Sequence, residues 1–94
     1  MKFLGRTQLA AFLRDHPEQA DTLQAWLSEI QYRDWRTRDA LASDFQSVDA
    51  TRTPLAVFRL GRPALVIETL VDFRNGIVLL TGIRIATESQ PLLN

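Results

Sequence analysis

Apolar residues in the first half of the chain recur every three or four positions, the spacing that is typical of amphipathic helices. A first helix is predicted over residues 8–15, with Thr7 as its cap. His16-Pro17 interrupts the pattern, and proline suits the first turn of a second helix that runs to about Ile30. The apolar stripe of this second helix consists of Ala20, Leu23, Leu27 and Ile30, with Trp26 beside it.

A linker and a short helix complete this half of the chain. Residues 31–36 are mostly polar but include two aromatic side chains. Thr37 is expected to cap a third helix that ends near Phe45. Residues 47–54 are predicted to form a loop, because Ser, Thr, Asp and Pro dominate there.

The second half is rich in β-branched and aliphatic residues, which predicts strands over residues 55–60, 64–73 and 77–87. Gly61-Arg62-Pro63 marks the first turn. Asn75-Gly76 predicts a two-residue hairpin turn, since both residue types tolerate positive φ. Helices followed by antiparallel strands indicate an α+β fold, with N-terminal helices packed on an antiparallel sheet of three or more strands.

A two-residue turn would give the last two strands two distinct faces. The face expected to contact the helices carries Leu65, Ile67, Thr69, Val71, Phe73, Val78, Leu80, Gly82 and Arg84. The second face carries Val66, Glu68, Leu70, Asp72, Ile77, Leu79, Thr81, Ile83 and Ile85. A small antiparallel sheet usually leaves one face in water, so a second apolar face indicates that something covers it.

Composition limits the possible functions. A chain of 94 residues is expected to form a single domain over 1–94. Eleven basic residues balance eleven acidic ones, so contact with nucleic acid would need a local basic patch. The chain has no cysteine and one histidine, so neither a metal site nor a cofactor is expected. No apolar run reaches the about 20 residues of a membrane helix, and no signal peptide is evident, so the cytoplasm is the expected location.

A series of landmarks over residues 4–88 resembles the HigB family of toxins, in the RelE-like superfamily. Their order and spacing carry the resemblance, rather than any one of them. The landmarks are His16-Pro17, Trp26, Asp34-Trp35, Leu41, Phe45, Ser47, Asp49, Val57-Phe58, Gly61, Phe73 and Gly76-Ile77-Val78.

The resemblance implies a RelE-like fold and a toxin that cuts mRNA on the ribosome until a cognate antitoxin protein neutralises it. The chain differs from the family at several positions where other members carry catalytic residues. A Tyr-Arg pair of the second strand falls on Leu65-Val66, and an arginine of the third strand falls on Thr81. Of a C-terminal "THxEY" segment, only Glu88 remains, and neither His16 nor Tyr32 falls on a catalytic position.

Six residues are candidates for a metal-independent RNA site. Cleavage needs a base for the ribose 2′-OH, cations for the phosphate and an acid for the leaving 5′-oxygen. The catalytic candidates are Glu68, Arg84 and Glu88, and the RNA-binding candidates are Arg59, Arg62 and Arg74. Each also has an ordinary explanation, as a surface ion pair or a solvated charge.

The alternative interpretation is a catalytically degenerate relative that binds protein. It would keep a surface for an antitoxin, or for a second copy paired through the second sheet face, and would have lost the RNA site. Neutral net charge and aliphatic residues at family catalytic positions favour it.

Overall fold

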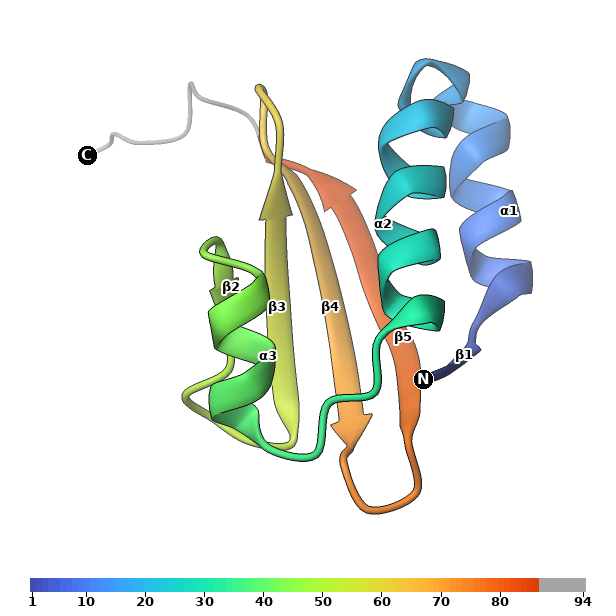
Figure 1. Ribbon diagram of the computed structural model, residues 1–94. Helices are drawn as coiled ribbons and strands as arrows, with labels where there is room; N and C mark the ends of the chain where they lie inside the picture. Colours follow the sequence, from blue (N-terminus) through green and yellow to red (C-terminus); the bar gives the residue numbers. More distant parts are fainter. Residues whose placement is uncertain (87–94) are drawn as a thin grey trace.

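A five-stranded sheet carries all three α-helices on one of its faces (Figure 1). The structure is a computed structural model that describes residues 1–86. The elements are β1 (Lys2–Leu4), α1 (Arg6–Asp15), the 3-10 turn η1 (Pro17–Gln19), α2 (Ala20–Tyr32), α3 (Arg38–Asp44), β2 (Val48–Asp49), β3 (Leu55–Leu60), β4 (Leu65–Asp72) and β5 (Ile77–Ile85). The predicted α+β class is confirmed. The strand order is β1-β5-β4-β3-β2, and the predicted strand end at Thr87 lies outside the described residues.

Strand β1 was not expected from the sequence. It precedes the helices and pairs in parallel with β5, so the sheet is mixed rather than purely antiparallel, and the helices are not all N-terminal to it. Phe3 is buried opposite Val78. Gly5 then turns the chain into α1 with φ of 120°, where a Cβ atom would lie 2.7 Å from the Leu80 Cβ. Three residues are too few to show an alternating pattern, which is why β1 escaped prediction.

The sequence predicted the end of α1 and the start of α3 correctly, but not the start of α1. α1 begins one residue before Thr7, so the predicted cap is wrong, and Gly5 occupies the capping position without a side chain. His16 ends α1 as predicted. Thr37 caps α3 as predicted, and its side chain accepts a hydrogen bond of 3.1 Å from the backbone N–H of Ala40.

The buried stripe of α2 differs from the expected one. Leu23, Trp26 and Ile30 are buried, whereas Ala20 is exposed and Leu27 is only partly buried. Trp26 therefore lies within the stripe rather than beside it. The indole covers more apolar area than an alanine at the helix start could, so the helix is rotated to bury it.

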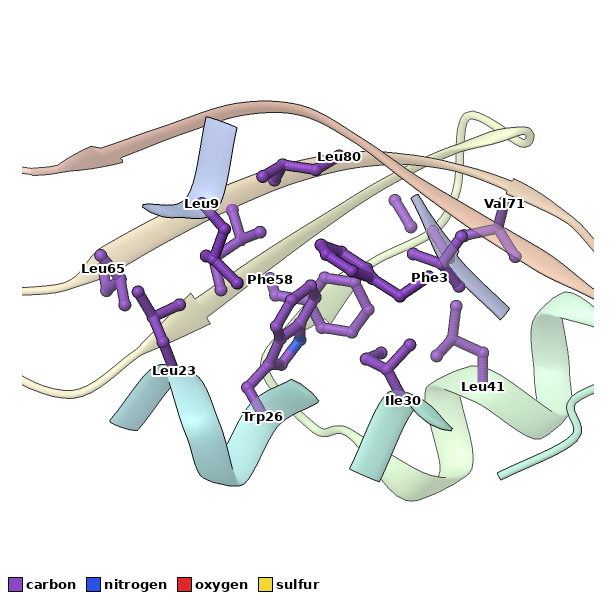
Figure 2. Close-up of a cluster of buried hydrophobic side chains, with 14 of the residues drawn as sticks. Phe3, Leu9, Leu23, Trp26, Ile30, Leu41, Phe58, Leu65, Val71 and Leu80 are labelled. Atoms are coloured by element: carbon purple, nitrogen blue, oxygen red, sulfur yellow. The ribbon is translucent and has the colours of Figure 1, made fainter. Parts of the chain in front are cut away.

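Aromatic side chains occupy the centre of the core, between the sheet and the helices (Figure 2). Trp26 makes edge-to-face contacts with Phe3 and Phe58, at ring-centroid distances of 5.7 and 5.4 Å. Phe45 extends the cluster to α3 through a further contact with Phe58. These ring contacts hold α2 and α3 against one face of the sheet.

The β4–β5 hairpin has a longer turn than predicted. β4 ends at Asp72 and β5 begins at Ile77, so residues 73–76 form a four-residue loop. The Asp72 carboxylate accepts hydrogen bonds from the backbone and side-chain nitrogens of Asn75, at 3.0 and 2.7 Å. These bonds favour the longer loop, and of the expected Asn75-Gly76 pair, Gly76 takes the positive φ.

A bulge changes the register of the same two strands. Thr69 pairs with Leu80, but the next residue, Glu68, pairs with Gly82. Thr81 is therefore left over, as in a β-bulge. No residue pattern in a single strand reveals an extra residue of this kind, because the bulge depends on the pairing of two strands.

The bulge reverses the faces predicted for the end of β5. Ile83 and Ile85 pack against the core, although the sequence placed them on the second face. Gly82 and Arg84 lie on the face away from the helices, although the sequence placed them toward the helices. A one-residue shift moves every following side chain to the other face, so both assignments were wrong for one reason.

Candidate functional site

The face of the sheet opposite the helices, hereafter the open face, has no helix over it in residues 1–86. Its side chains come from four strands, in rows set by the pairing. They are Lys2, Leu4, Leu55, Val57, Arg59, Val66, Glu68, Leu70, Asp72, Ile77, Leu79, Gly82 and Arg84. The open face is polar toward the β3–β4 turn, is apolar around the row of Leu4, Leu70 and Leu79, and ends at the β4–β5 loop in a row that carries Lys2 and Asp72.

Glu68 and Arg84 form an ion pair on the open face. Arg84 Nη1 donates to Glu68 Oε2 at 3.0 Å, and the two side chains are 55% and 39% exposed, respectively. The bulge at Thr81 makes this pair possible, because it turns Arg84 to the side of Glu68. The Thr81 hydroxyl also donates to the Glu68 carbonyl at 3.0 Å, which fastens the two strands at the bulge.

Gly82 lies under the Glu68 carboxylate. A Cβ atom at Gly82 would come 2.7 Å from Glu68 Oε1 and 3.7 Å from its Cβ. The missing side chain therefore leaves the space through which Glu68 reaches Arg84. This is a role for glycine that needs no unusual backbone angle, only close approach.

A second cation accompanies Arg84. Arg59 of β3 and Arg84 of β5 both pair with Val66 of β4, so their Cα atoms are about 10 Å apart across two strand spacings. Asp49 lies beside Arg59 at the sheet edge. Hydrogen bonds from Thr51 hold the pKa of Asp49 below its usual value, with smaller effects from Arg52 and Arg59.

The six predicted site residues do not all converge. Glu68, Arg84 and Arg59 are brought together on the open face, and Arg62 lies in the turn just after β3. Arg74 lies in the loop at the opposite end of β4, about 26 Å along the strand from the Val66 row that holds Arg59 and Arg84, at ~3.3 Å per residue. Its predicted place in one RNA site with Arg84 is not supported by this position. Glu88 lies outside the described residues.

The apolar half of the open face contains a groove of about 540 Å³, hereafter the leucine groove. Three leucines in one row, Leu4, Leu70 and Leu79, are each nearly 40% exposed there. The whole lining is Leu4, Thr53, Pro54, Leu70, Val71, Asp72, Phe73, Ile77 and Leu79. Three exposed large apolar side chains in one patch differ from the singly scattered apolar residues of an ordinary protein surface.

The sequence pattern did not place three residues of the open face correctly. Lys2 and Leu4 were missed because β1 was not recognised, and Gly82 was assigned to the wrong face. One signal was available: Gly82 interrupts an otherwise aliphatic strand, and glycine inside a strand often marks a bulge or a close approach.

No protein-family model matches this chain, and no curated protein sequence matches it significantly. Within residues 1–86, no three Asp, Glu or His side chains come together as metal ligands. None of the helices in that range is long and apolar enough to span a membrane.

Proposed function

We propose that this chain is a HigB-like toxin of a toxin–antitoxin pair, an RNA endonuclease with a RelE-like fold and its active site on the open face. The observation that carries the proposal is the Glu68–Arg84 ion pair with Arg59 beside it. These residues bring one carboxylate and two guanidinium groups from three strands together on an accessible surface. The landmarks shared with the HigB family support the same assignment.

These groups suit RNA cleavage through the 2′-OH. Glu68 takes the proton of the 2′-OH, and the 2′-oxygen then bonds to phosphorus. The bond from phosphorus to the 5′-oxygen breaks, and a 2′,3′-cyclic phosphate forms. Arg84 and Arg59 stabilise the negative charge that develops on the phosphate oxygens. The 5′-oxygen must gain a proton, and Glu88 remains the predicted source.

Arg84 has two tasks in this scheme. Before substrate binds, its ion pair with Glu68 holds the carboxylate in place over Gly82. Because a guanidinium carries five N–H donors, it can bind a phosphate oxygen while it keeps one bond to the carboxylate. A lysine in this position would lack the planar fork of donors that holds both partners in a fixed geometry.

The direct test is cleavage of mRNA on purified ribosomes. Glu68→Gln keeps the size and the hydrogen bond to Arg84 but cannot accept the proton, so the cleavage rate should fall by about 100-fold or more. Asp39→Asn is the matched control, since that carboxylate is 95% exposed on α3. Cleavage that is equally fast in Glu68→Gln and in the parent chain would remove Glu68 from the mechanism.

The leucine groove favours a second candidate, a protein-binding relative without nuclease activity. The positions that align with the family's Tyr-Arg pair, Leu65 and Val66, are fully buried and offer nothing to RNA. Exposed Leu4, Leu70 and Leu79 would then contact an antitoxin or a second copy of this chain. A folded chain that cleaves no RNA, and whose dimer or antitoxin complex is lost in Leu70→Lys, would establish this candidate instead.

A further inference from the structure

The leucine groove begins where the proposed cleavage site ends. Leu70 follows Glu68 by two residues on the same face of β4, which places their Cα atoms about 7 Å apart. Leu79 pairs with Leu70 and widens the apolar floor. A nucleotide whose 2′-OH meets Glu68 can therefore extend its base over these leucines. A groove of about 540 Å³ is within the usual size of small-molecule sites.

Two opposite charges share the row of Ile77, which lines the far end of this groove. Lys2 and Asp72 both pair with Ile77, one on each side, so their Cα atoms are about 10 Å apart. Asp72 also lines the groove. The two Asn75 hydrogen bonds lower the pKa of Asp72, so the side chain is a carboxylate that only accepts hydrogen bonds. The Lys2 ammonium only donates them.

We propose that the leucine groove binds a nucleobase of the RNA strand and selects guanine, with Asp72 and Lys2 as the specificity-determining residues. Guanine presents two adjacent donors, N1–H and the N2 amino group, that a carboxylate accepts together, and an O6 acceptor for an ammonium. Uracil offers one donor between two acceptors, so one of its carbonyls would face the carboxylate. Adenine and cytosine place an acceptor where Asp72 requires a donor.

This inference rests on the proposed function, because an RNA strand brings the base to the groove. The polar end distinguishes a base from an apolar protein segment as the occupant. A leucine or phenylalanine of a partner would fill the groove floor but would use neither the Lys2 ammonium nor the acceptor positions that Asp72 keeps beside its two Asn75 bonds. Guanine uses the floor and both charges at once.

The test is a titration with the 3′-monophosphates of guanosine, adenosine, cytidine and uridine, followed by NMR of the leucine methyl groups. The guanosine nucleotide should bind about tenfold more tightly than the other three and shift the methyl signals of Leu70 and Leu79. Asp72→Asn should abolish this preference, and Asp39→Asn should retain it. If Asp72→Asn disturbs the hairpin loop, Lys2→Met provides a second variant, which should also lose guanine preference.

The outcomes distinguish the proposed guanine site from the proposed nuclease activity. Equal binding of all four nucleotides, or cleavage without base preference, overturns guanine selection and leaves the nuclease proposal intact. Guanosine-selective binding by a chain that cleaves no RNA supports guanine recognition in the leucine groove and overturns the proposed nuclease activity. Leucine signals that respond to protein concentration but not to any nucleotide overturn the base site and identify the groove as a contact between copies.

Discussion

At the scale of single residues, the proposed site depends on a glycine as much as on its charged groups. Glu68 and Arg84 are both partly exposed, and an ion pair between exposed side chains contributes little to stability. Their alignment therefore needs a structural cause. Gly82 supplies it, because the Glu68 carboxylate lies in the space that any other side chain would fill.

We predict that Gly82→Ala displaces the Glu68 carboxylate and breaks its bond to Arg84. A Cβ atom 2.7 Å from Glu68 Oε1 is closer than packing allows, so the flexible carboxylate must move. The cleavage rate should fall about tenfold or more, since misplacement by about 1 Å weakens catalysis strongly. NMR of the Glu68 carboxyl carbon would report the displacement directly.

Gly61→Ala is the matched control for that substitution. It adds the same methyl group where nothing lies within 4 Å, although its φ of 74° makes the change strained. It should lower stability and leave the Glu68 carboxyl signal in place. An unchanged Glu68 signal in Gly82→Ala would refute the role of Gly82.

At the scale of elements, the sequence predicted what depends on local chemistry. The α2 helix follows from apolar spacing, the Thr37 cap from a capping residue, and strand β3 from a short, mostly apolar run between turn residues. Features that depend on contacts between distant segments were missed. The clearest is the bulge at Thr81, which brings Arg84 to the side of Glu68. Both residues were site candidates, but the predicted faces put them on opposite sides of the sheet.

The loop between β4 and β5 should make stability depend on acid pH. The hydrogen bonds from Asn75 favour ionised Asp72 and lower its pKa in the folded state. Its contribution is therefore present above the unfolded pKa, about 4, and is lost as the pH falls through the lower folded value. The stability difference between the parent and Asp72→Ala should thus shrink as the pH falls below about 4, as measured by urea unfolding.

A difference that stays constant between pH 7 and pH 2 would contradict that assignment. Asp39→Ala is the comparison for charge alone, because Asp39 has no hydrogen bond of this kind among the described residues. Its effect should be small at every pH. Asp49 shares the lowered pKa, so its own contribution remains in both proteins and cancels in the difference.

The segment between α2 and α3 is anchored by one tryptophan. Trp35 is buried, and its indole N–H donates to Asp44 at 2.6 Å. We predict a coupling energy of about 1–2 kcal/mol between Trp35→Phe and Asp44→Ala in a double-mutant cycle of chemical unfolding. Additive effects of the two substitutions would show that packing alone holds Trp35.

At the scale of the whole molecule, a chain of zero net charge presents two unlike faces. Helices cover one side of the sheet (Figure 1). The open face combines cations, the Glu68–Arg84 ion pair and exposed leucines. Any attraction to RNA must therefore be local. With Arg59, Arg62 and Arg84 as the phosphate contacts, the salt dependence of binding to single-stranded RNA should be shallow, with a slope of about −2.

Removal of one arginine tests the proposed number of phosphate contacts. Arg62→Ala should reduce the magnitude of the slope by about 0.7, as measured by fluorescence titration at several salt concentrations. Arg14→Ala removes an exposed cation from α1, on the helical side, and should leave the slope unchanged. Equal effects of the two substitutions would show that Arg62 is not one of the phosphate contacts.

The most direct test of the central claim is growth arrest after induced expression in a bacterial host. The parent chain should stop growth, and both Glu68→Gln and Arg84→Ala should restore it, whereas Asp39→Asn should remain toxic. This pattern is expected because the claim assigns toxicity to the Glu68–Arg84 site. Normal growth with a folded, abundant parent chain, or arrest by all four proteins alike, would contradict the claim.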